Sequence, residues 1–528
     1  MPSSSWAPLR RPLFRSLWLA AVASNVGTWM QNVGAVWLMT SLTPSPLMVA
    51  LVQTATSLPV FLLALPAGAL ADIVDRRRLL IAAQSAMLLA AAALGVLTVA
   101  GRMTPWALLG LTFVIGVGSA MNGPAWQAIM PELVPRAELT AAIALNGVAM
   151  NVARAVGPAL GGLVIAVAGT GPVFLLNAAS FVGVIAVLGR WRRVPRASTL
   201  PPERVAGAIR AGLRYARHAP ALDAVLVRAG LFVFCASALW ALLPVVARQR
   251  LGVGSTGYGV LLGCLGVGAI AGAAILPRLT ARLSIDAMVA AGTLAFAAVT
   301  CALAVTTSVV SLCAALVAGG LAWLAVMASL NVAAQTTAAP WVQARALALY
   351  LLVFQGGLAA GSAVWGAVAA RSGAPVALAA AAGGLAVGLA AIARWRLAPG
   401  QTLDLRPSAH IPEPSVVLEP PPEDGPVLVT IEYTIDPARA EEFTRAMREM
   451  SRVRRRDGAT RWELFTDPAE PGRYLECFLV ESWVEHMRQH QRATMADREA
   501  WDRTRAFQVG DAPPRASHFV AALGEGER

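Results

Sequence analysis

A single arginine inside a long apolar run is the residue of this sequence best placed to hold a ligand. Arg154 follows Asn146 and Asn151 in the run from residue 138 to residue 168. An arginine near the middle of a membrane helix costs about 2.5–3.5 kcal/mol on insertion scales, so it is kept mainly where it faces a cavity or a partner. We expect these three residues to line a substrate cavity. Alternatively, Arg154 could have a structural role and join helices by hydrogen bonds.

Other apolar runs carry amides and aromatic rings at helical spacing. Residues three or four apart share one face of a helix, and such faces predict further cavity residues: Asn25, Trp29, Asn32, Asn122, Trp126, Arg228, Tyr350 and Gln355. A cavity that is mostly apolar with a few amides suits an amphipathic organic molecule and poorly suits a highly charged one. Any single amide could instead bond one helix to another, and Arg228, five residues after Asp223, could form an ion pair near the membrane edge.

A glycine, two aspartates and three arginines gather between the second and third apolar runs. The order is Gly68-Ala-Leu-Ala-Asp72-Ile-Val-Asp75-Arg76-Arg77-Arg78. Glycine lets a neighbouring helix approach closely, and Asp72 is placed to accept hydrogen bonds from a helix N-terminus or from Arg76. We expect Gly68, Asp72, Asp75, Arg76 and Arg77 to form a conformational lock. The alternative is that the arginines merely anchor the loop.

A proline and three glycines follow Arg154 on the same apolar run, in the order Gly157-Pro158-Ala-Leu-Gly161-Gly162. Pro158 removes a backbone donor, and the glycines permit close contact between helices. The motif predicts a kinked, small-faced helix packed tightly against another part of the protein. Simple packing of two helices is the alternative.

The pattern of cysteines and histidines does not indicate catalysis. The five cysteines show no CxxC spacing, so we expect neither disulfides nor a metal site. His486 and His490, four residues apart, could bind a metal or haem, but no Glu or Cys completes a ligand set. We therefore expect no catalytic residues and no cofactor.

Length and composition place most of this chain in a lipid bilayer. It has 528 residues, of which 57% are hydrophobic and 14% charged, whereas soluble proteins carry about 25% charged residues. A helix needs about 20 apolar residues to cross a bilayer, so the apolar runs predict an all-α membrane fold with twelve transmembrane helices. The predicted spans are 16–41, 46–71, 78–100, 105–130, 138–168, 172–190, 222–247, 256–277, 286–306, 309–336, 342–370 and 374–395.

The arginines predict which side of the membrane each loop faces. Twenty lie in one set of alternate loops and ends up to Arg396, and four lie in the other set: Arg102, Arg248, Arg250 and Arg371. Since arginine-rich short loops stay in the cytoplasm, we expect a multi-pass protein of a bacterial plasma membrane with both termini in the cytoplasm. The same loops explain much of the net charge of +13, so we expect the bilayer, and not nucleic acid, as a partner.

The longest loop, 190–222, divides the membrane region into two sets of six spans. A weak internal repeat supports this division: the run 157–162 resembles Gly-Ser-Ala-Val-Trp-Gly at 361–366. Parallel halves around a central site are an architecture of secondary transporters. The predicted parts are an N-terminal six-helix half at 1–190, an arginine-rich loop at 191–221, a C-terminal half at 222–395, a proline-rich linker at 396–426 and a small domain at 427–523.

Three runs resemble motifs of the major facilitator superfamily. The run from Gly68 to Arg78 resembles its cytoplasmic signature loop, and the run from Gly157 to Gly162 is similar to an element of its exporter branch. Residues 122–136, Asn-Gly-Pro-Ala-Trp-Gln-Ala-Ile-Met-Pro-Glu-Leu-Val-Pro-Arg, look like the group that includes the enterobactin and macrolide efflux permeases. The resemblance implies proton-coupled efflux of drugs or siderophores. No Asp or Glu lies at mid-depth in the predicted spans, which leaves Asp72 and Asp223 as titrating candidates.

The tail reads as a separate α+β domain. Residues 396–426 hold eight prolines and predict an extended linker that does not pack. The strands expected at 427–434, 460–466, 473–481 and 518–523, with helices at 437–453 and 482–507, give a ferredoxin-like β-α-β-β-α-β order. The runs 462–465, 474–478 and 483–490 resemble the antibiotic-biosynthesis-monooxygenase type of dimeric α+β barrel. That resemblance implies self-association or substrate sensing, and we expect no catalysis from the tail.

These features predict a secondary transporter that exports amphipathic organic compounds by alternating access. The main alternative is a membrane-tethered monooxygenase or ligand-binding tail to which the helices deliver a compound. A third reading, import, is opposed mainly by the motif at 157–162.

Overall fold

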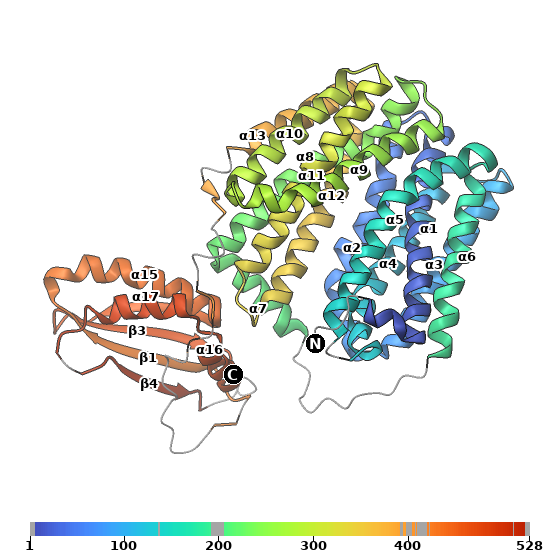
Figure 1. Ribbon diagram of the computed structural model, residues 1–528. Helices are drawn as coiled ribbons and strands as arrows, with labels where there is room; N and C mark the ends of the chain where they lie inside the picture. Colours follow the sequence, from blue (N-terminus) through green and yellow to red (C-terminus); the bar gives the residue numbers. More distant parts are fainter. Residues whose placement is uncertain are drawn as a thin grey trace. The chain divides into compact units, whose positions relative to one another are not determined.

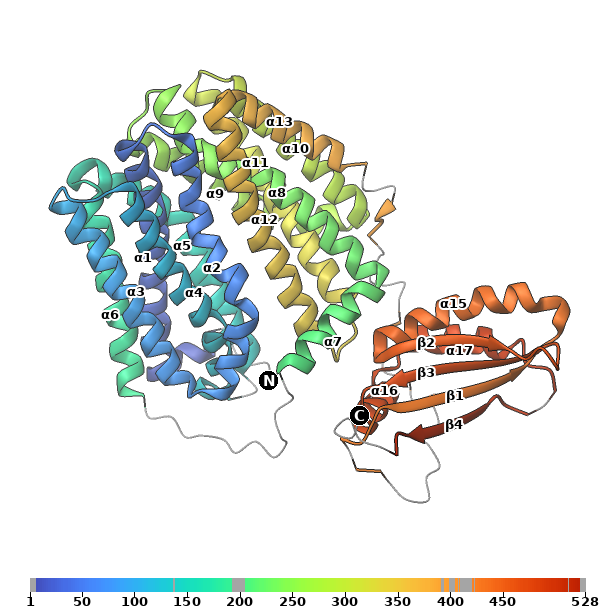
Figure 2. The ribbon, with the colours of Figure 1, turned by 180° about the vertical axis from the view of Figure 1, so that it is seen from behind.

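The structure is a computed structural model. It describes residues 6–135, 138–191, 205–390, 394–397, 404–406, 408, 420–421, 423–510 and 512–522. Figures 1 and 2 show the helices and strands from opposite sides. Contacts between residues divide the chain into two compact units. Unit 1 holds residues 1–201, 227–330 and 350–394, and unit 2 holds residues 202–226, 331–349 and 395–528.

The first helix set lies within unit 1 and follows a short 3-10 helix, Ala7–Arg10. Its members are α1 (Pro12–Leu42), α2 (Pro46–Ile73), α3 (Arg76–Val99), α4 (Pro105–Leu133), α5 (Leu139–Ala168) and α6 (Thr170–Arg190). Proline stands in the first turn of α1, α2 and α4, where its missing N–H has no intrahelical partner to lose. The Gly169 backbone, with φ of 83°, separates α5 from α6.

The second helix set begins after α7 (Val205–His218), a helix that the sequence analysis had treated as part of a loop. The set contains α8 (Pro220–Gln249), α9 (Ser255–Thr280), α10 (Ile285–Val305), α11 (Val309–Thr336), α12 (Gln343–Ser372) and α13 (Ala374–Gly388). The loop residues 192–204 lie outside the described residues.

The helices of both sets have the length and composition of membrane spans. Ten of the described helices are long and apolar enough to cross a bilayer. The two remaining predicted spans coincide with α1, which has 31 residues, and α13, which has 15. Aliphatic side chains such as Leu89, Val167 and Val310 are exposed on these helices, as expected for surfaces that face lipid chains.

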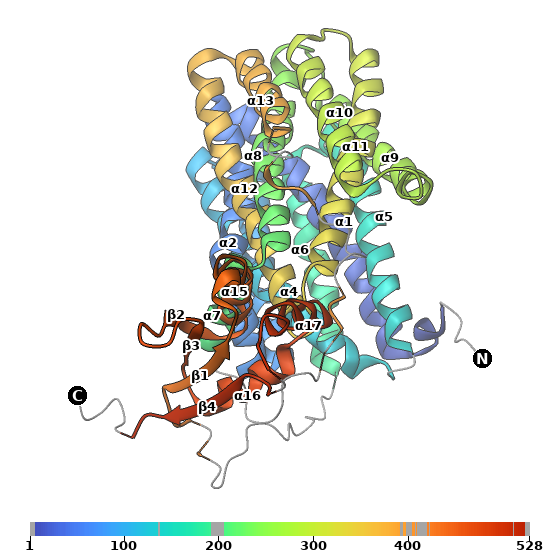
Figure 3. The same cartoon turned by 90° about the vertical axis from the view of Figure 1, so that its left-hand side faces the viewer.

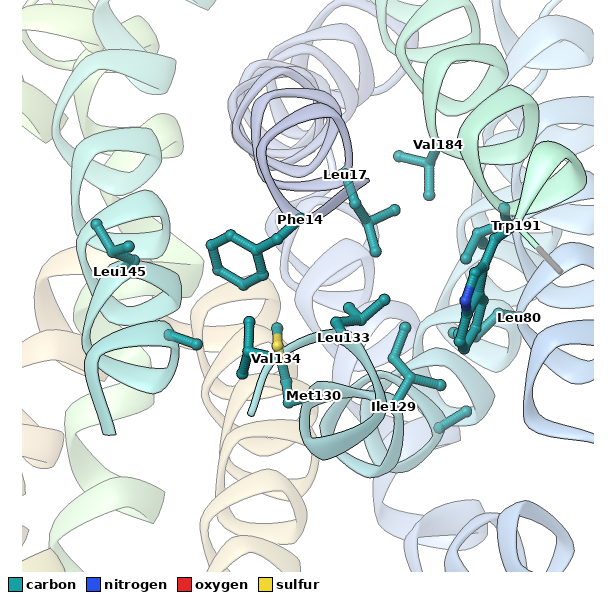
Figure 4. Packing of buried hydrophobic residues seen from close by; sticks show 13 residues of the cluster. Phe14, Leu17, Leu80, Ile129, Met130, Leu133, Val134, Leu145, Val184 and Trp191 are labelled. Atoms are coloured by element: carbon teal, nitrogen blue, oxygen red, sulfur yellow. The ribbon is translucent and has the colours of Figure 1, made fainter. Parts of the chain in front are cut away.

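The core of the first set lies near the helix ends that carry Arg76, Arg77 and Glu138, here named the arginine-rich end. Figure 4 shows Phe14 and Leu17 from α1 close to Leu133 at the end of α4. Leu80 from α3 belongs to the same buried cluster. This cluster joins five helices at one end of the set, and it continues outward in an ion pair between Arg11 and Glu138 at 2.9 Å.

A four-stranded antiparallel sheet with helices on one face forms the tail (Figures 1 and 3). The strands are β1 (Val427–Thr434), β2 (Ala459–Thr466), β3 (Arg473–Val480) and β4 (Arg515–Val520), in the order β2-β3-β1-β4. The helices are α15 (Ala440–Asp457), α16 (Trp483–Arg492) and α17 (Met495–Arg505). Alternate residues of β1, including Val429 and Tyr433, are buried against Phe443 and Met447 of α15, which is the period expected of a sheet covered on one face.

Two expectations for the tail are corrected by the structure. The helix predicted at 482–507 is two helices, because the Thr494 side chain and Asp497 form a capping box that begins α17. The linker does pack where it is described. The backbone N–H of Met495 donates to Arg406, and that of Ser408 donates to Ala493, so the extended chain satisfies backbone groups at the break between α16 and α17.

Candidate substrate cavity and conformational lock

A cavity of about 320 Å³ lies inside unit 1 between the two helix sets. Helices α1, α2 and α5 line it from the first set, and α8, α9, α11 and α12 line it from the second set. Its described lining consists of Trp29, Asn32, Val33, Val36, Val52, Gln53, Thr56, Arg154, Pro158, Trp240, Tyr258, Leu262, Leu265, Gly266, Ala269, Gly320, Trp323, Phe354 and Leu358. A site shared by two helix sets is the arrangement found in secondary transporters.

The first set gives the cavity its polar wall. Trp29 and Asn32 are three residues apart on α1, so both reach the same face. The Arg154 guanidinium carbon lies 5.6 Å from the centre of the Trp29 ring, a distance at which the ring attracts a cation. Gln53 and Thr56 add amide and hydroxyl groups from α2.

The second set gives the cavity an aromatic wall centred on Trp323. Its ring centre lies 5.5 Å from that of Trp240 and 6.2 Å from that of Phe354. The rings of Phe232 and Phe296 support it from behind at 5.8 and 5.7 Å. Such edge and tilted contacts fix the position of the rings, which presents a flat apolar surface to a ligand.

Several predicted cavity residues instead bond one helix to another. The Gln84 side chain donates to Asn122 Oδ1 at 3.0 Å, and Trp126 Nε1 donates to Asn146 Oδ1 at 3.3 Å. Tyr350 is buried, and its hydroxyl donates to the Met327 carbonyl at 3.4 Å. For these residues the structure favours the alternative role as polar contacts between helices.

Four other predicted residues are also absent from the described lining: Asn25, Asn151, Arg228 and Gln355. Asn25 and Gln355 are half-buried and Asn151 is exposed. Arg228 is buried and forms an ion pair with Asp286 at the start of α10. For Arg228 the structure favours the alternative role in an ion pair, because a carboxylate from a neighbouring helix lies beside it.

The predicted lock residues that the structure describes hold the first helix set together. Asp75 caps α3 by accepting a hydrogen bond from the Arg78 backbone N–H at 2.9 Å. Arg76 bonds to Glu132 of α4 at 3.1 Å. Arg77 donates to the carbonyls of Leu188 and Gly189 at 2.7 and 2.6 Å, where a helix C-terminus favours positive charge.

The remaining lock residues, Gly68 and Asp72, lie near the end of α2 at positions whose side chains are outside the described residues. The described contacts of Arg76 and Arg77 therefore join α3 to α4 and α6. They do not test the predicted contact of Asp72 with Arg76.

The glycine motif of α5 lies where neighbouring helices approach most closely. A Cβ atom on Gly157 would meet Trp29 Cβ at 2.5 Å, and one on Gly161 would meet the Met30 backbone at 3.0 Å. On the other side, a Cβ on Gly162 would come within 2.8 Å of the Ser255 carbonyl and 3.1 Å of Gly259 Cα. The motif thus packs α5 against α1 and also against α9 of the second set.

A further contact between the two sets involves the α8–α9 connection, on the side opposite to the arginine-rich end. The Trp37 and Tyr258 rings stack with centres 5.8 Å apart. The Arg248 guanidinium lies 5.5 Å from the Trp37 ring and donates to Thr40 at 3.0 Å. Together with the α5–α9 packing, these contacts join the two helix sets at this end of the cavity.

Within unit 2, the tail domain is bonded to α7 through a buried carboxylate. Glu485 accepts from Arg492 at 2.5 Å and from Arg214 of α7 at 3.0 Å. Burial alone would raise the pKa of Glu485, but the hydrogen bonds and charges of these two arginines lower it. Arg492 also stacks on Trp341, between α11 and α12, at 4.6 Å.

Three histidines of the tail lie close together. The His486 ring is 4.9 Å from that of His490 and 4.8 Å from that of His518, measured between centres. Burial, and then the charges of the two neighbouring histidines, lowers the pKa of His486 to about 3. Among the described residues no group of three or more His, Cys, Asp and Glu side chains has the arrangement to hold a metal ion.

Comparison with known proteins identifies the family. Residues 3–525 match the family described as transmembrane secretion effector. The chain belongs to this family of major facilitator superfamily transporters. The match to the transmembrane secretion effector family continues beyond the membrane helices and through the tail.

Curated relatives of this effector chain include transporters of siderophores and drugs. It is 31% identical over 164 residues to the staphyloferrin A transporter of Staphylococcus aureus. The aligned residues make up 31% of this chain and 41% of that protein. It is 23% identical over 243 residues to macrolide efflux protein A of Streptococcus pyogenes, covering 45% and 59%. It is 28% identical over 244 residues to the multidrug efflux pump Tap of Mycolicibacterium fortuitum, covering 44% and 59%. The matched part thus spans about half the length of these relatives.

Solved structures support the fold of the effector chain. A bacterial homologue of the human lysosomal transporter Spinster, in an inward-facing and occupied conformation, aligns with a TM-score of 0.60 at 15% identity. The alignment covers 74% of this chain and 98% of that one. A POT family transporter in complex with 5-aminolevulinic acid aligns with the same TM-score at 12% identity, covering 72% and 95%.

The sequence analysis did not predict the wall of the cavity that comes from the second helix set. Trp240, Tyr258 and Trp323 stand in otherwise apolar runs, where an aromatic residue is usually a packing residue. Gln53 and Thr56, three residues apart on one span, were the polar signal that could have added α2 to the cavity.

Proposed function

We propose that this transmembrane secretion effector is a secondary transporter that exports amphipathic organic compounds of the drug or siderophore kind by alternating access. The observation that carries the proposal is the cavity between the two helix sets, with Arg154 on a polar wall and Trp323 on an aromatic one. A ligand with an apolar body and a few polar groups would satisfy both walls. The names of the relatives, a siderophore transporter and two efflux proteins, point to the same class of cargo.

The proposed topology has twelve crossings, with both termini and the tail in the cytoplasm of a bacterial cell. Ten helices qualify by length and apolarity, and α1 and α13 complete the set. The fivefold excess of arginine in one set of loops supports the orientation, because such loops are retained on the cytoplasmic side.

In the proposed cycle, the two helix sets rock about the bound compound. The packing of Gly162 on Gly259 and the stacking of Trp37 on Tyr258 would close the outer end while the compound enters from the cytoplasm. The contacts of Arg76 and Arg77 support movement of the first set as one body, since they join α3 to α4 and α6.

Protons are the proposed driving ion. The described cavity lining holds no Asp or Glu, so a titrating carboxylate would lie elsewhere. The candidates are Asp72 and Asp223, as the sequence analysis proposed.

Transport into inside-out membrane vesicles tests direction and coupling together. We expect vesicles with this protein to accumulate a radiolabelled macrolide or a siderophore of the staphyloferrin type when the vesicle interior is made more acidic than the medium. An uncoupler should abolish the accumulation, and empty-vector vesicles are the control. Accumulation only by intact cells, with none by inverted vesicles for any compound of this class, would contradict export.

The tail is proposed to be a ferredoxin-like domain that self-associates or senses the compound beside the transporter. The strand order β2-β3-β1-β4 and the helices on one face support this fold. The rival proposal is that the tail oxidises or binds the cargo. Deleting residues 400–528 distinguishes the two proposals. If the deletion variant exports the compound but no longer converts it chemically, the rival proposal is favoured. If neither the full-length protein nor the deletion variant converts the compound, the rival proposal is opposed.

A further inference from the structure

Arg154 is a cavity cation without a compensating acid in the described structure. Arg154 makes no hydrogen bond or ion pair with any described residue, and its one close partner is the Trp29 ring. This separates it from Arg228, which pairs with Asp286, and from Arg248, which donates to Thr40. The described cavity lining contains no Asp or Glu.

Arg154 is exposed and lines the cavity, so its guanidinium is available to a ligand and is not used for packing. Helices normally pair such a charge with a carboxylate or with backbone carbonyls. The polar groups beside Arg154 in the lining, on Asn32, Gln53 and Thr56, are neutral. The site therefore has a positive potential and five unused N–H donors, which a bound carboxylate or sulfonate would satisfy.

Trp240, on the other helix set, carries a second N–H donor without a partner among the described residues. The indole Nε1 of Trp240 is buried and has no hydrogen-bond acceptor in the described structure. Trp240 lines the cavity, and its ring packs edge-on against Trp323. The Nε1 atom has no exposed surface, so what Trp240 offers a ligand in the cavity is its aromatic ring.

We propose that the cavity selects an organic monoanion with an aromatic or similarly flat apolar body. The anionic group binds Arg154 over Trp29, and the flat body lies on the rings of Trp240, Trp323 and Phe354. One cation in a cavity of about 320 Å³ neutralises one negative charge, so multiply charged anions are disfavoured. The inference rests on the proposed transport function and narrows its substrate class.

Three probes with the same ring system and different charge test the proposal. 2-Naphthoate is an anion, 2-naphthamide is neutral, and 2-naphthylmethylammonium is a cation. Binding of each to the full-length protein in lipid nanodiscs is measured by calorimetry, with empty nanodiscs as the reference for partition into lipid. We expect naphthoate to bind at least tenfold more tightly than the amide, and the ammonium compound to bind more weakly than the amide.

Variants of Arg154 assign the preference to the proposed site. Arg154→Gln should remove the tenfold preference for naphthoate and leave binding of the amide within about twofold. Arg154→Lys keeps the charge and should retain a reduced preference. Trp240→Leu removes an aromatic ring from the cavity lining and should weaken the binding of naphthoate and of the amide alike, without changing the preference for the anion. Arg102→Gln, in an exposed turn between α3 and α4, makes the same charge change outside the cavity and should alter neither.

Equal affinities for the three probes, tightest binding of the cation, or an unchanged preference in Arg154→Gln would overturn the inference. If Arg154→Gln fails to fold, the comparison of Arg154→Lys with Arg102→Gln decides, because only a cavity role makes their anion preferences differ. Export of cationic drugs into inverted vesicles, without anion binding, would sink this inference and leave the transport proposal standing. Absence of transport for every class would instead remove the proposal on which it rests.

Discussion

At the scale of single residues, the cations of the membrane region differ in what surrounds them. Arg154 faces a cavity, Arg77 bonds to the carbonyl end of α6, and Arg228 is held by Asp286. The side chain of Arg228 is only 5% exposed. A charge in such a place is tolerated because its partner is beside it, and removing one partner strands the other.

Replacement of Asp286 by asparagine should therefore destabilise the protein strongly. The buried guanidinium of Arg228 would lose its carboxylate, which costs about 3–5 kcal/mol for pairs of this kind. The change is measured as a lowered thermal midpoint of the detergent-solubilised protein. The double variant Arg228→Leu with Asp286→Leu, which leaves no stranded charge, should recover much of the loss. A single variant as stable as the parent would show that the pair contributes little.

The acid response of the tail depends on one histidine. His486 is buried among His490 on its own helix, His518 on β4 and the positive charge of Arg454 on α15, with Gln489 as a hydrogen-bonding partner. In the unfolded chain it would take a proton near pH 6.5, but in the folded tail its pKa is about 3. Its contribution to stability is thus complete above pH 6.5 and is lost as the pH falls toward 3, at about 1.4 kcal/mol per pH unit.

Between pH 7 and pH 5 we expect the tail to lose about 2 kcal/mol from this residue, before most carboxylates titrate. Hydrogen exchange of α16 in the full-length protein measures the loss. His486→Phe should remove more than half of the slope, and the remainder is expected from His518, whose pKa is also lowered by burial. Equal slopes in parent and variant would assign the acid response elsewhere.

At the scale of elements, the glycines of α5 decide how closely helices approach. Gly162 meets Gly259 of α9, whereas Gly147 on the same helix has nothing within 4 Å of a Cβ atom. Gly162 and Gly147 are both glycines of α5, but their neighbours differ. A comparison of alanine at each position therefore separates helix packing from helix propensity.

Gly162→Ala should destabilise the contact between α5 and α9, because the new methyl group would lie 2.8 Å from the Ser255 carbonyl. Overpacking of this kind costs about 1–3 kcal/mol, and we expect impaired transport together with a lower thermal midpoint. Gly147→Ala should be neutral or stabilising by up to about 1 kcal/mol, because alanine favours a helix. Similar behaviour of the two variants would indicate that the α5–α9 contact can relax.

At the scale of the whole molecule, unit 2 combines the tail with α7 and with the connection between α11 and α12. Glu485 bonds to Arg214 and Arg492, and Arg456 lies over the Tyr215 ring at 5.6 Å. The Tyr215 hydroxyl in turn accepts a hydrogen bond from the Ala339 backbone at 3.1 Å. One carboxylate thus joins the tail to a helix that is more than 250 residues away in sequence.

Glu485→Gln should loosen this connection, since the buried Arg492 and the half-buried Arg214 would lose their counter-charge. We expect faster hydrogen exchange in α7 and α16 and faster proteolysis within residues 205–218. Glu463→Gln, on the exposed side of β2, changes the same charge without touching the network and is the control. Equal protection in the two variants would mean that Glu485 does not hold α7 against the tail.

The apolar runs, the arginine bias and the motifs by themselves determined that this chain is a membrane transporter with an α+β tail. These features depend on local composition and on period, which follow from how single helices and strands meet lipid, water and a core. The rule that polar groups in apolar helices need polar surroundings selected Trp29, Asn32 and Arg154, which line the cavity, but it also selected residues that do not line it.

Only the tertiary structure decided which polar residues face the cavity and which join helices. Asn122 and Arg228 look as much like ligand-binding residues as Arg154 does, until Gln84 and Asp286 are seen beside them. The aromatic wall of Trp240 and Trp323 likewise exists only once four helices of the second set are packed. The cause is that partners distant in sequence satisfy a buried polar group, and no local pattern encodes which partner the packing will supply.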